Sequence, residues 1–451
     1  MDDPHVAPQA REYSADLYRV VAVVVVVVGH WLLSAVTYHD GRFGYDEVLA
    51  EMPWTQWLTW FFQVVPVFFL VAGYANAASW TRRRETGGGT GNWLRHRSAG
   101  ILGPTTAYVA VVLAAVATAV LVGVDGSRLS IPGWVVALHL WFIPVYLGVV
   151  SLTPLAVAAQ RRWGLKVPAA MAVGVALVDA VTLGGHVAHL GLVNYLLCWG
   201  AVYQTGVAWF GGAFHGRRPA VLAVGAAVVL ATVIALGLYP VAMIGVTGQL
   251  VHNTSPPTVA LLALAGVQSG LLLTAAPAVT AWLRRARWRP LLAVANANAL
   301  GLYLWHMVPV VAVALACYPT DLIPQPDLGS GAWWRWRFVW ILILAAVTGA
   351  ELMSLYVGRS WFARPIHGFN VPLPVRWSSP LLVVGTLGAG VALTRLAAGG
   401  VAPDGRFPTV TALVYAAGVT MVGMHPAGFR RQSTEPHAVH LGGAPGPGGR
   451  R

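Results

Sequence analysis

The sequence contains very few charged residues. Asp, Glu, Lys and Arg together make up 10% of its 451 residues, whereas hydrophobic residues make up 57%. A soluble domain is about 25% charged, so this chain lacks the polar surface that a water-soluble domain needs. Its apolar runs are each close to the roughly 20 residues that a helix needs to cross a bilayer. Because backbone groups in lipid must be paired within such a segment, we expect an all-α integral membrane protein.

The chain is also poor in cysteine and in catalytic loop motifs. Its two cysteines, Cys198 and Cys317, both lie inside apolar runs, which argues against a disulfide framework or a cysteine metal site. The glycine-rich stretch 87–91 is not followed by the Gly-Lys-Ser/Thr of a phosphate-binding loop. No Gly-x-Ser-x-Gly nucleophile elbow occurs. The sequence therefore gives no support to nucleotide hydrolysis or to serine-based acyl transfer.

The apolar runs predict a polytopic bundle of about twelve membrane helices. Residues 1–16 are polar and the first apolar run is long enough to span a membrane, so we predict no cleavable signal peptide. The expected spans lie near residues 17–37, 56–79, 99–122, 133–158, 168–184, 190–213, 219–239, 258–282, 291–317, 335–357, 379–398 and 408–425.

The charged residues that give the net charge of +13 alternate between loops in a pattern that indicates the membrane topology. Loops after the even-numbered spans carry the arginine clusters. The other loops are poor in Lys and Arg and hold acidic residues: Asp40, Asp46, Glu47, Glu51, Asp321 and Asp327. Since Lys and Arg stay on the cytoplasmic side, we predict cytoplasmic termini in a plasma-membrane protein, with the Asp40–Glu51 loop outside. A patch that bound nucleic acid would not skip every second loop, so no nucleic-acid partner is expected. The cytoplasmic clusters include Arg82, Arg83, Arg84, Arg95, Arg97, Arg161, Arg162, Arg217, Arg218, Arg284 and Arg285.

Two polar residues interrupt the first span. Ten residues separate Arg19 from His30, which places His30 about 16 Å deeper than Arg19 and on the same helix face. Polar groups in lipid are costly and usually face a cavity or the bundle interior. The pair could bracket one tunnel; alternatively, Arg19 is a positive-inside anchor and His30 a hydrogen-bonded core histidine.

This arrangement resembles the membrane-bound acyltransferase 3 family, whose hallmark is an Arg, ten residues and a His in the first membrane helix. Three further stretches are similar to family motifs: Phe68–Tyr74, Leu140–Ile143 and Leu302–His306. Ala72 stands where the family often has Ser. The resemblance implies an acyltransferase core of about ten helices (17–358) after a cytoplasmic segment (1–16). A C-terminal extension with two further helices (359–425) and a disordered cytoplasmic tail (426–451) follow.

The resemblance further implies an acyl-CoA donor on the cytoplasmic side, with acetyl-CoA as the default, and a hydroxyl acceptor. The acceptor would be a glycan, a cell-envelope component or a small metabolite. His30 would act as general base, which a neutral imidazole can do near pH 7, and Arg19 would hold coenzyme A phosphates. An acyl-histidine intermediate is the alternative route. Further substrate or tunnel candidates are His139, Trp141, Tyr74, His306 and Glu351.

His139 and His306 lie at a membrane depth similar to that of His30, by residue counting from the predicted outer face. Three histidines on three helices could line one cavity, or they could be packing histidines. No acidic residue accompanies them at ligand spacing, so we predict no metal.

Three other sets of polar residues need an explanation. Glu351, deep in the tenth span, either pairs with an arginine or lines the donor tunnel. Asp179 is expected to be structural. Arg335 and Arg337, interleaved with tryptophans, predict an interfacial aromatic belt or, alternatively, a platform that stacks on a sugar.

A secondary transporter is the rival class, because about twelve spans with cytoplasmic termini and intramembrane charges are common there. No repeat relates the two halves of this sequence, which favours the enzyme.

Overall fold

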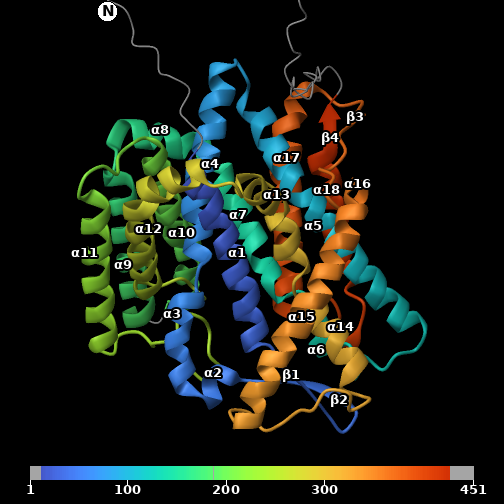
Figure 1. The fold of residues 1–451 in the computed structure, drawn as a ribbon. Coiled ribbons are helices and arrows are strands. Elements are labelled where there is room, and N and C mark those ends of the chain that lie inside the picture. Colours follow the sequence, from blue (N-terminus) through green and yellow to red (C-terminus); the bar gives the residue numbers. More distant parts are fainter. Residues whose placement is uncertain (1–11, 186, 427–451) are drawn as a thin grey trace, which may run out of the picture.

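The computed structural model describes residues 12–185 and 187–426, which form a bundle of helices with very little sheet (Figure 1). Most of the expected N-terminal segment (1–16) and nearly all of the expected tail (426–451) therefore lie outside the described residues. The first half of the chain contains α1 (Tyr13–Leu33), β1 (Ala35–His39), β2 (Arg42–Asp46), α2 (Val48–Glu51), α3 (Thr59–Phe62), α4 (Val65–Glu85), α5 (Thr90–Leu121), α6 (Ser130–Val135), η3 (Leu138–Trp141), α7 (Phe142–Ser151), α8 (Thr153–Trp163), α9 (Lys166–Gly185) and α10 (Val193–Phe210). The second half contains α11 (Arg218–Ala235), α12 (Val259–Arg285), α13 (Arg289–Trp305), α14 (Val308–Cys317), α15 (Gly331–Val357), α16 (Arg359–Phe362), β3 (Phe369–Val371), α17 (Ser378–Gly399), α18 (Thr409–Gly423) and β4 (Met424–Pro426).

The structure does not confirm the expected number of twelve spans. In the described residues, nine helices are long and apolar enough to cross a membrane, or ten if the bent pair α13–α14 counts as one span. The other two expected spans correspond to α10 and α18. Helix α10 carries buried Asn194 and Gln204 and packs among α4, α9 and α12, where protein rather than lipid surrounds it. Helix α18 is only 15 residues long.

The first span ends earlier than expected. The apolar run predicted a helix to residue 37, but α1 ends at Leu33 and Ala35 begins the hairpin β1–β2. The hairpin turns through Asp40 and Gly41, which both have positive φ (50° and 78°). An Asp-Gly pair is the preferred loop of a two-residue hairpin, so the sequence held this signal. The hairpin and α2 lie at the opposite end of the bundle from the start of α1 and from α8 (Figure 1).

Two expected helices are broken. The expected span 133–158 consists of α6, the 3₁₀ turn η3, α7 and α8. The expected span 291–317 bends by 46° between α13 and α14, at His306 and Met307. Irregular backbone at membrane depth is tolerated where protein covers it, and His139 and His306, at these two breaks, are 1% and 0% exposed. Each break therefore places a buried histidine between two α-helical segments, His139 in the 3₁₀ turn η3 and His306 in the turn between α13 and α14.

The stretch Phe68–Tyr74 is a helix-packing segment. A Cβ on Gly73 of α4 would lie 2.0 Å from the carbonyl oxygen of Tyr203 on α10, and one on Gly206 would lie 2.0 Å from that of Leu70. Small residues let helices approach closely in membranes. The glycine of this stretch therefore fixes the contact between α4 and α10.

The C-terminal helices pack into the rest of the bundle. Helix α17 contacts η3 and α7 as well as α18, so it supports the turn that carries His139. Arg95 on α5, which is 4% exposed, ties these segments together. Its Nη1 donates to the carbonyls of Val422 (2.7 Å) and Met424 (2.8 Å), and its Nη2 to the carbonyl of Ser378 (2.8 Å). In the sequence, Arg95 belongs to a cluster of arginines, which had suggested that it serves only to set the membrane topology.

We expect Arg95→Ala to lower the free energy of unfolding by about 3 kcal/mol, because hydrogen bonds of a charged group are worth about 1.5–3 kcal/mol and buried carbonyls would lose their donor. Thermal unfolding of the purified protein in detergent measures the loss. His96→Ala, at an exposed neighbouring position, is the control and should change stability by less than about 0.5 kcal/mol. Equal stability of the two variants would show that the Arg95 contacts do not hold the C-terminal helices.

Candidate active site

Three histidines from distant parts of the chain meet in the bundle. His30 Nδ1 lies 2.7 Å from His306 Nε2, and the two rings are nearly parallel, with an interplanar angle of 9° and centroids 5.0 Å apart. His139 meets the ring of His306 edge-on at 5.1 Å. The structure thus brings together the three histidines that residue counting had placed at one depth.

Two side chains donate hydrogen bonds to backbone carbonyls at the two helix breaks. Helix ends expose carbonyls without an intrahelical partner. The indole N–H of Trp31 donates to the carbonyl of His306 (2.9 Å), and the hydroxyl of Tyr303 donates to the carbonyl of His139 (2.5 Å). Both bonds join a break to a neighbouring element, so they hold the histidines in place relative to one another.

The hydrogen bonds fix the tautomers of the histidine pair. His306 Nδ1 lies 2.6 Å from the carbonyl oxygen of Tyr303, and because a carbonyl can only accept, this nitrogen carries the proton. With both rings neutral, Nε2 of His306 is then the acceptor and Nδ1–H of His30 the donor. Nε2 of His30 is left with a lone pair, so the pair presents one basic nitrogen.

His139 differs from the other two. Its ring is buried against Tyr303 and Tyr108, at centroid distances of 5.4 and 5.6 Å. Neither of its ring nitrogens makes a hydrogen bond of normal geometry within the described part of the chain. His139 is therefore close enough to shape the site, but it does not belong to the hydrogen-bonded pair.

Arg19 lies at the other end of α1, eleven residues from His30. Its Nη1 donates to the side-chain carbonyl of Asn296 on α13 (3.1 Å), and Asn296 donates to Asp16 (3.0 Å). A small pocket of about 230 Å³ opens beside this chain, lined by residues that include Tyr13, Asp16 and Arg289. The end of the bundle where α1 begins therefore carries a pocket lined by Arg289, next to the hydrogen-bonded chain that includes Arg19.

The other candidates lie apart from the histidine pair. Tyr74 packs on Trp209 of α10, with ring centroids 4.5 Å apart, and Trp141 packs near Trp199 at 6.4 Å. Glu351 on α15 has a buried Oε2 that has no hydrogen-bond partner among the described residues, so of its two alternatives the pairing with an arginine is not seen at this oxygen. Asp179 accepts hydrogen bonds from Asn194, Tyr239 and the backbone N–H of Val259, in keeping with a structural role.

Sequence reasoning missed two residues at the site. Tyr303 lies within the Leu302–His306 stretch, three residues before His306, and neighbours at that spacing share a helix face. Arg337 had been assigned to an interfacial belt, but it is 8% exposed. It donates to the carbonyl of Ser34 at 3.0 Å and stacks on Trp333 at 4.6 Å. It therefore caps the free carbonyls at the end of α1, which no pattern in its own segment could indicate.

The described residues contain no group of three or more His, Cys, Asp or Glu side chains placed to hold a metal ion. The His30–His306 pair is an imidazole hydrogen-bonded to a second imidazole. Such a group can remove a proton from a hydroxyl that is hydrogen-bonded to it, which activates the oxygen for attack on a carbonyl carbon.

Comparison with known proteins identifies the family. A family model described as an acyltransferase domain matches residues 12–394. The match includes the α13–α14 break with its histidine and reaches into α17, beyond the core boundary expected at residue 358. No curated protein and no solved structure is detectably similar to the chain. The matched family and the long apolar helices agree with each other: the chain belongs to the acyltransferase 3 family and is a multi-pass membrane protein.

Proposed function

We propose that this protein transfers an acyl group, with acetyl as the expected one, from acyl-coenzyme A to a hydroxyl of a carbohydrate, cell-envelope component or small metabolite. The observation that carries the proposal is the hydrogen bond of 2.7 Å between His30 and His306. With the tautomers fixed by the carbonyl of Tyr303, it leaves Nε2 of His30 as a general base. Arg19, on the same helix, is the proposed contact for the phosphates of the donor.

In the proposed reaction, Nε2 of His30 takes the proton of the acceptor hydroxyl while the oxygen attacks the thioester carbonyl carbon. The C–O bond forms, the C–S bond breaks, and the coenzyme A sulfur leaves with the electron pair of that bond. The imidazolium of His30 then returns the proton to the sulfur, giving an ester and the free thiol. Because His30 Nδ1–H donates to His306, the charge that His30 gains is shared with a second imidazole.

The experiment that tests the function uses the purified chain in lipid vesicles with acetyl-coenzyme A inside or outside. Thiol release that depends on a hydroxyl acceptor, with the acetyl mass appearing on that acceptor, supports the enzyme. Movement of an unmodified solute without thiol release would support a transporter instead. Mass spectrometry of envelope glycans and secreted metabolites from wild-type and deletion cells then identifies the natural acceptor through a missing acyl mass.

We further propose that the start of α1 and the arginine clusters are cytoplasmic, in a plasma membrane, and that the β1–β2 hairpin is outside. Single cysteines in a chain without Cys198 and Cys317 test this with a membrane-impermeant thiol reagent on intact cells. We expect a cysteine at exposed Arg42 in β2 to be labelled. One at Gly89, where an added Cβ meets open space, should be labelled only after lysis. The reverse pattern would invert the topology.

We expect Arg19→Ala to raise the KM for acetyl-coenzyme A about tenfold while changing the KM for the acceptor less than twofold. The reason is that a guanidinium at the donor entrance binds phosphate directly, about 16 Å along α1 from His30. Initial rates at varied donor and varied acceptor concentrations give both constants. Arg217→Ala, at an exposed cytoplasmic-cluster position, is the matched loss of charge and should leave both unchanged. An unaltered donor KM in folded Arg19→Ala protein would remove Arg19 from the site.

A further inference from the structure

The residue before His30 is a glycine, and its missing side chain leaves room for Phe62 of α3. A Cβ on Gly29 would lie 2.9 Å from Cδ1 of Phe62 and 3.4 Å from its Cγ, whereas two carbon atoms in contact are about 3.5–4.0 Å apart. Gly29 is buried, so Phe62 packs directly against the backbone of α1, one residue from His30. No larger residue fits at position 29 unless α1 or Phe62 moves.

This contact and the histidine pair lie on different sides of α1. Successive residues of an α-helix are about 100° apart around its axis, so Gly29 and Trp31 are separated by about 200°. Gly29 faces Phe62, whereas Trp31 donates to the carbonyl of His306 (2.9 Å) and the ring of His30 bonds the ring of His306. The last turns of α1 are therefore held between α3 and the α13–α14 break, and any rotation of α1 about its axis changes both contacts.

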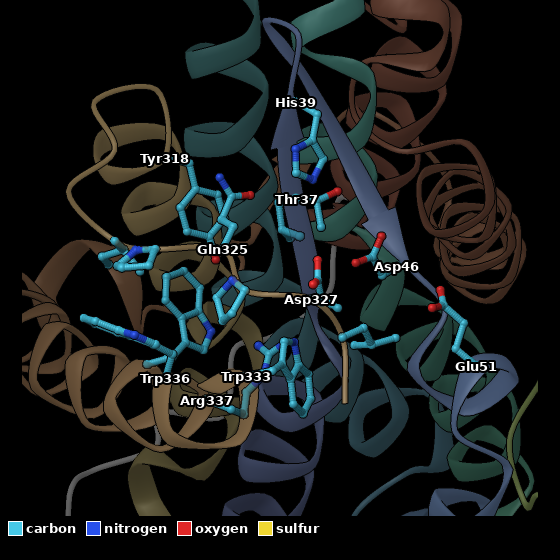
Figure 2. Close-up of a pocket in the computed structure, with 17 residues that line it drawn as sticks. Thr37, His39, Asp46, Glu51, Tyr318, Gln325, Asp327, Trp333, Trp336 and Arg337 are labelled. Atoms are coloured by element: carbon cyan, nitrogen blue, oxygen red, sulfur yellow. The ribbon is translucent and has the colours of Figure 1, made fainter. Parts of the chain in front are cut away.

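Arg337 of α15 holds the end of the same helix. It lies in the wall of a cavity of about 400 Å³ beyond the end of α1 (Figure 2), and it donates to the carbonyls of Ser34 (3.0 Å) and Trp31 (3.5 Å). Backbone carbonyls point roughly along the helix axis. These bonds therefore fix the position of α1 along its axis, and its rotation is left to the contacts on its sides.

Phe62 can constrain α1 only if α3 is itself fixed, and a loop from the other half of the chain fixes it. This loop, residues 236–258, connects α11 to α12. The side-chain amide of Gln63 donates to the carbonyl of Met243 (3.0 Å), and the backbone N–H of Met243 donates to the hydroxyl of Thr59 (2.8 Å). Thr59 and Gln63 lie on either side of Phe62 in the sequence, so the loop holds the backbone that carries this ring.

Loop 236–258 is well anchored where it contacts α3. The indole N–H of Trp60 donates to the carbonyl of Val241 (2.8 Å). Within the loop, the side-chain amide of Asn253 donates to the carbonyls of Pro240 and Ala242 (both 2.8 Å), and Asn253 and Ala242 are both fully buried. The segment that bonds α3 therefore has a fixed shape.

We propose that Phe62 is a positioning residue, which packs on Gly29 and so sets the rotation of α1 at which His30 bonds His306. The proposal rests on the proposed function, for which it adds a residue that acts through the base. A side-chain atom about 5–6 Å from the helix axis moves about 1 Å for each 10° of rotation. A bond of 2.7 Å lengthened by that amount is no longer a hydrogen bond, and misplacing a reacting group by about 1 Å can cost about 100-fold in rate.

Gly29→Ala tests the proposal, because the added methyl group must turn α1 or displace Phe62. Alanine is the better helix former, so a loss of activity would not come from unwinding of α1. We expect kcat for acyl transfer to fall at least tenfold, while the KM values for donor and acceptor change less than threefold. Adding Phe62→Leu, whose smaller side chain makes room for the methyl group, should bring kcat back to within threefold of wild type. Gly301→Ala on α13, where an added Cβ meets open space, is the matched control and should leave kcat unchanged.

NMR of ¹⁵N-histidine-labelled protein in lipid bilayers gives a readout that needs no turnover. The measured quantity is the coupling across the hydrogen bond between Nδ1 of His30 and Nε2 of His306, assigned by its loss in His30→Gln. We expect it in wild type and in Gly301→Ala, not in Gly29→Ala, and again in Gly29→Ala with Phe62→Leu. Gln63→Leu, which removes the bond to Met243, should weaken the coupling as well and is the second test should Gly29→Ala fail to fold.

The outcomes separate this inference from the proposed function. A coupling and a kcat that Gly29→Ala leaves unchanged, or losses that Phe62→Leu does not restore, overturn the positioning role even though acyl transfer is found. A coupling that Gly29→Ala removes and Phe62→Leu restores, in a chain that releases no thiol from acetyl-coenzyme A, leaves the positioning of His30 by Phe62 standing and sinks the transferase.

Discussion

His30→Gln should lower acyl transfer by 100- to 10,000-fold, the range that a general base contributes. Glutamine keeps a side-chain N–H that can donate to Nε2 of His306, but its amide has no basic lone pair at neutral pH. The acceptor hydroxyl would then have to lose its proton to water. Initial rates of thiol release from acetyl-coenzyme A, at saturating donor and acceptor, measure the effect.

The loss should not come from unfolding. His30 is one partly buried residue on α1, and its hydrogen bond to His306 can be replaced by glutamine, so the thermal midpoint should change by only a few degrees. A monodisperse peak in size-exclusion chromatography checks assembly. If folded His30→Gln protein kept near wild-type turnover, His30 would be a packing histidine and the base would have to be sought at His306 or His139.

The second large effect is expected at His306, which we assign as a positioning residue. His306→Phe retains a ring of similar size but removes the acceptor for Nδ1–H of His30. His30 could then adopt the other tautomer or turn its ring, and a base in the wrong tautomer loses orders of magnitude in rate. We expect kcat to fall about 100-fold and the KM for the donor to change less than threefold, as measured from full saturation curves.

Two variants separate orientation from packing. His306→Gln keeps a side-chain oxygen that can accept from His30, so it should recover part of the activity that His306→Phe loses. Tyr303→Phe removes the hydroxyl that bonds His139 but keeps the backbone carbonyl that orients His306. It should therefore lower stability by about 1 kcal/mol with little change in kcat. Equal kcat losses in all three variants would mean that packing alone explains the effect.

Much of the architecture follows from composition and periodicity. Apolar runs predicted where helices occur, and each expected span does correspond to helical segments. What the runs could not predict is where a helix breaks. The breaks at His139 and at His306 depend on partners from elsewhere in the chain, such as Trp31 bonding the carbonyl of His306. An apolar run indicates only that a segment is surrounded by lipid or by protein. It does not distinguish between the two, because apolar residues are favourable in both environments.

The hairpin after α1 shows a different limit. Its Asp40–Gly41 turn was visible in the sequence, but the strand Ala35–His39 reads as a continuation of the apolar run. The early end of α1 matters because Arg337 then pairs the carbonyl of Ser34. The guanidinium of Arg337 on α15 thereby donates the hydrogen bond that a backbone N–H of the next helical turn would otherwise supply.

By itself the sequence determined the membrane class, the segments that become helices and the identity of the residues with useful chemistry. Arg19 and His30 share one helix, so their spacing follows from helix geometry alone. The tertiary structure alone decided that His306 is the partner of His30 and that His139 is not, although all three were expected at one depth. Depth along the membrane is a property of a single helix, whereas hydrogen bonding at 2.7 Å requires two helices in one relative rotation. That rotation is set by contacts between the two elements, such as the hydrogen bond from the indole N–H of Trp31 on α1 to the carbonyl of His306, and the sequence of one helix does not contain this information.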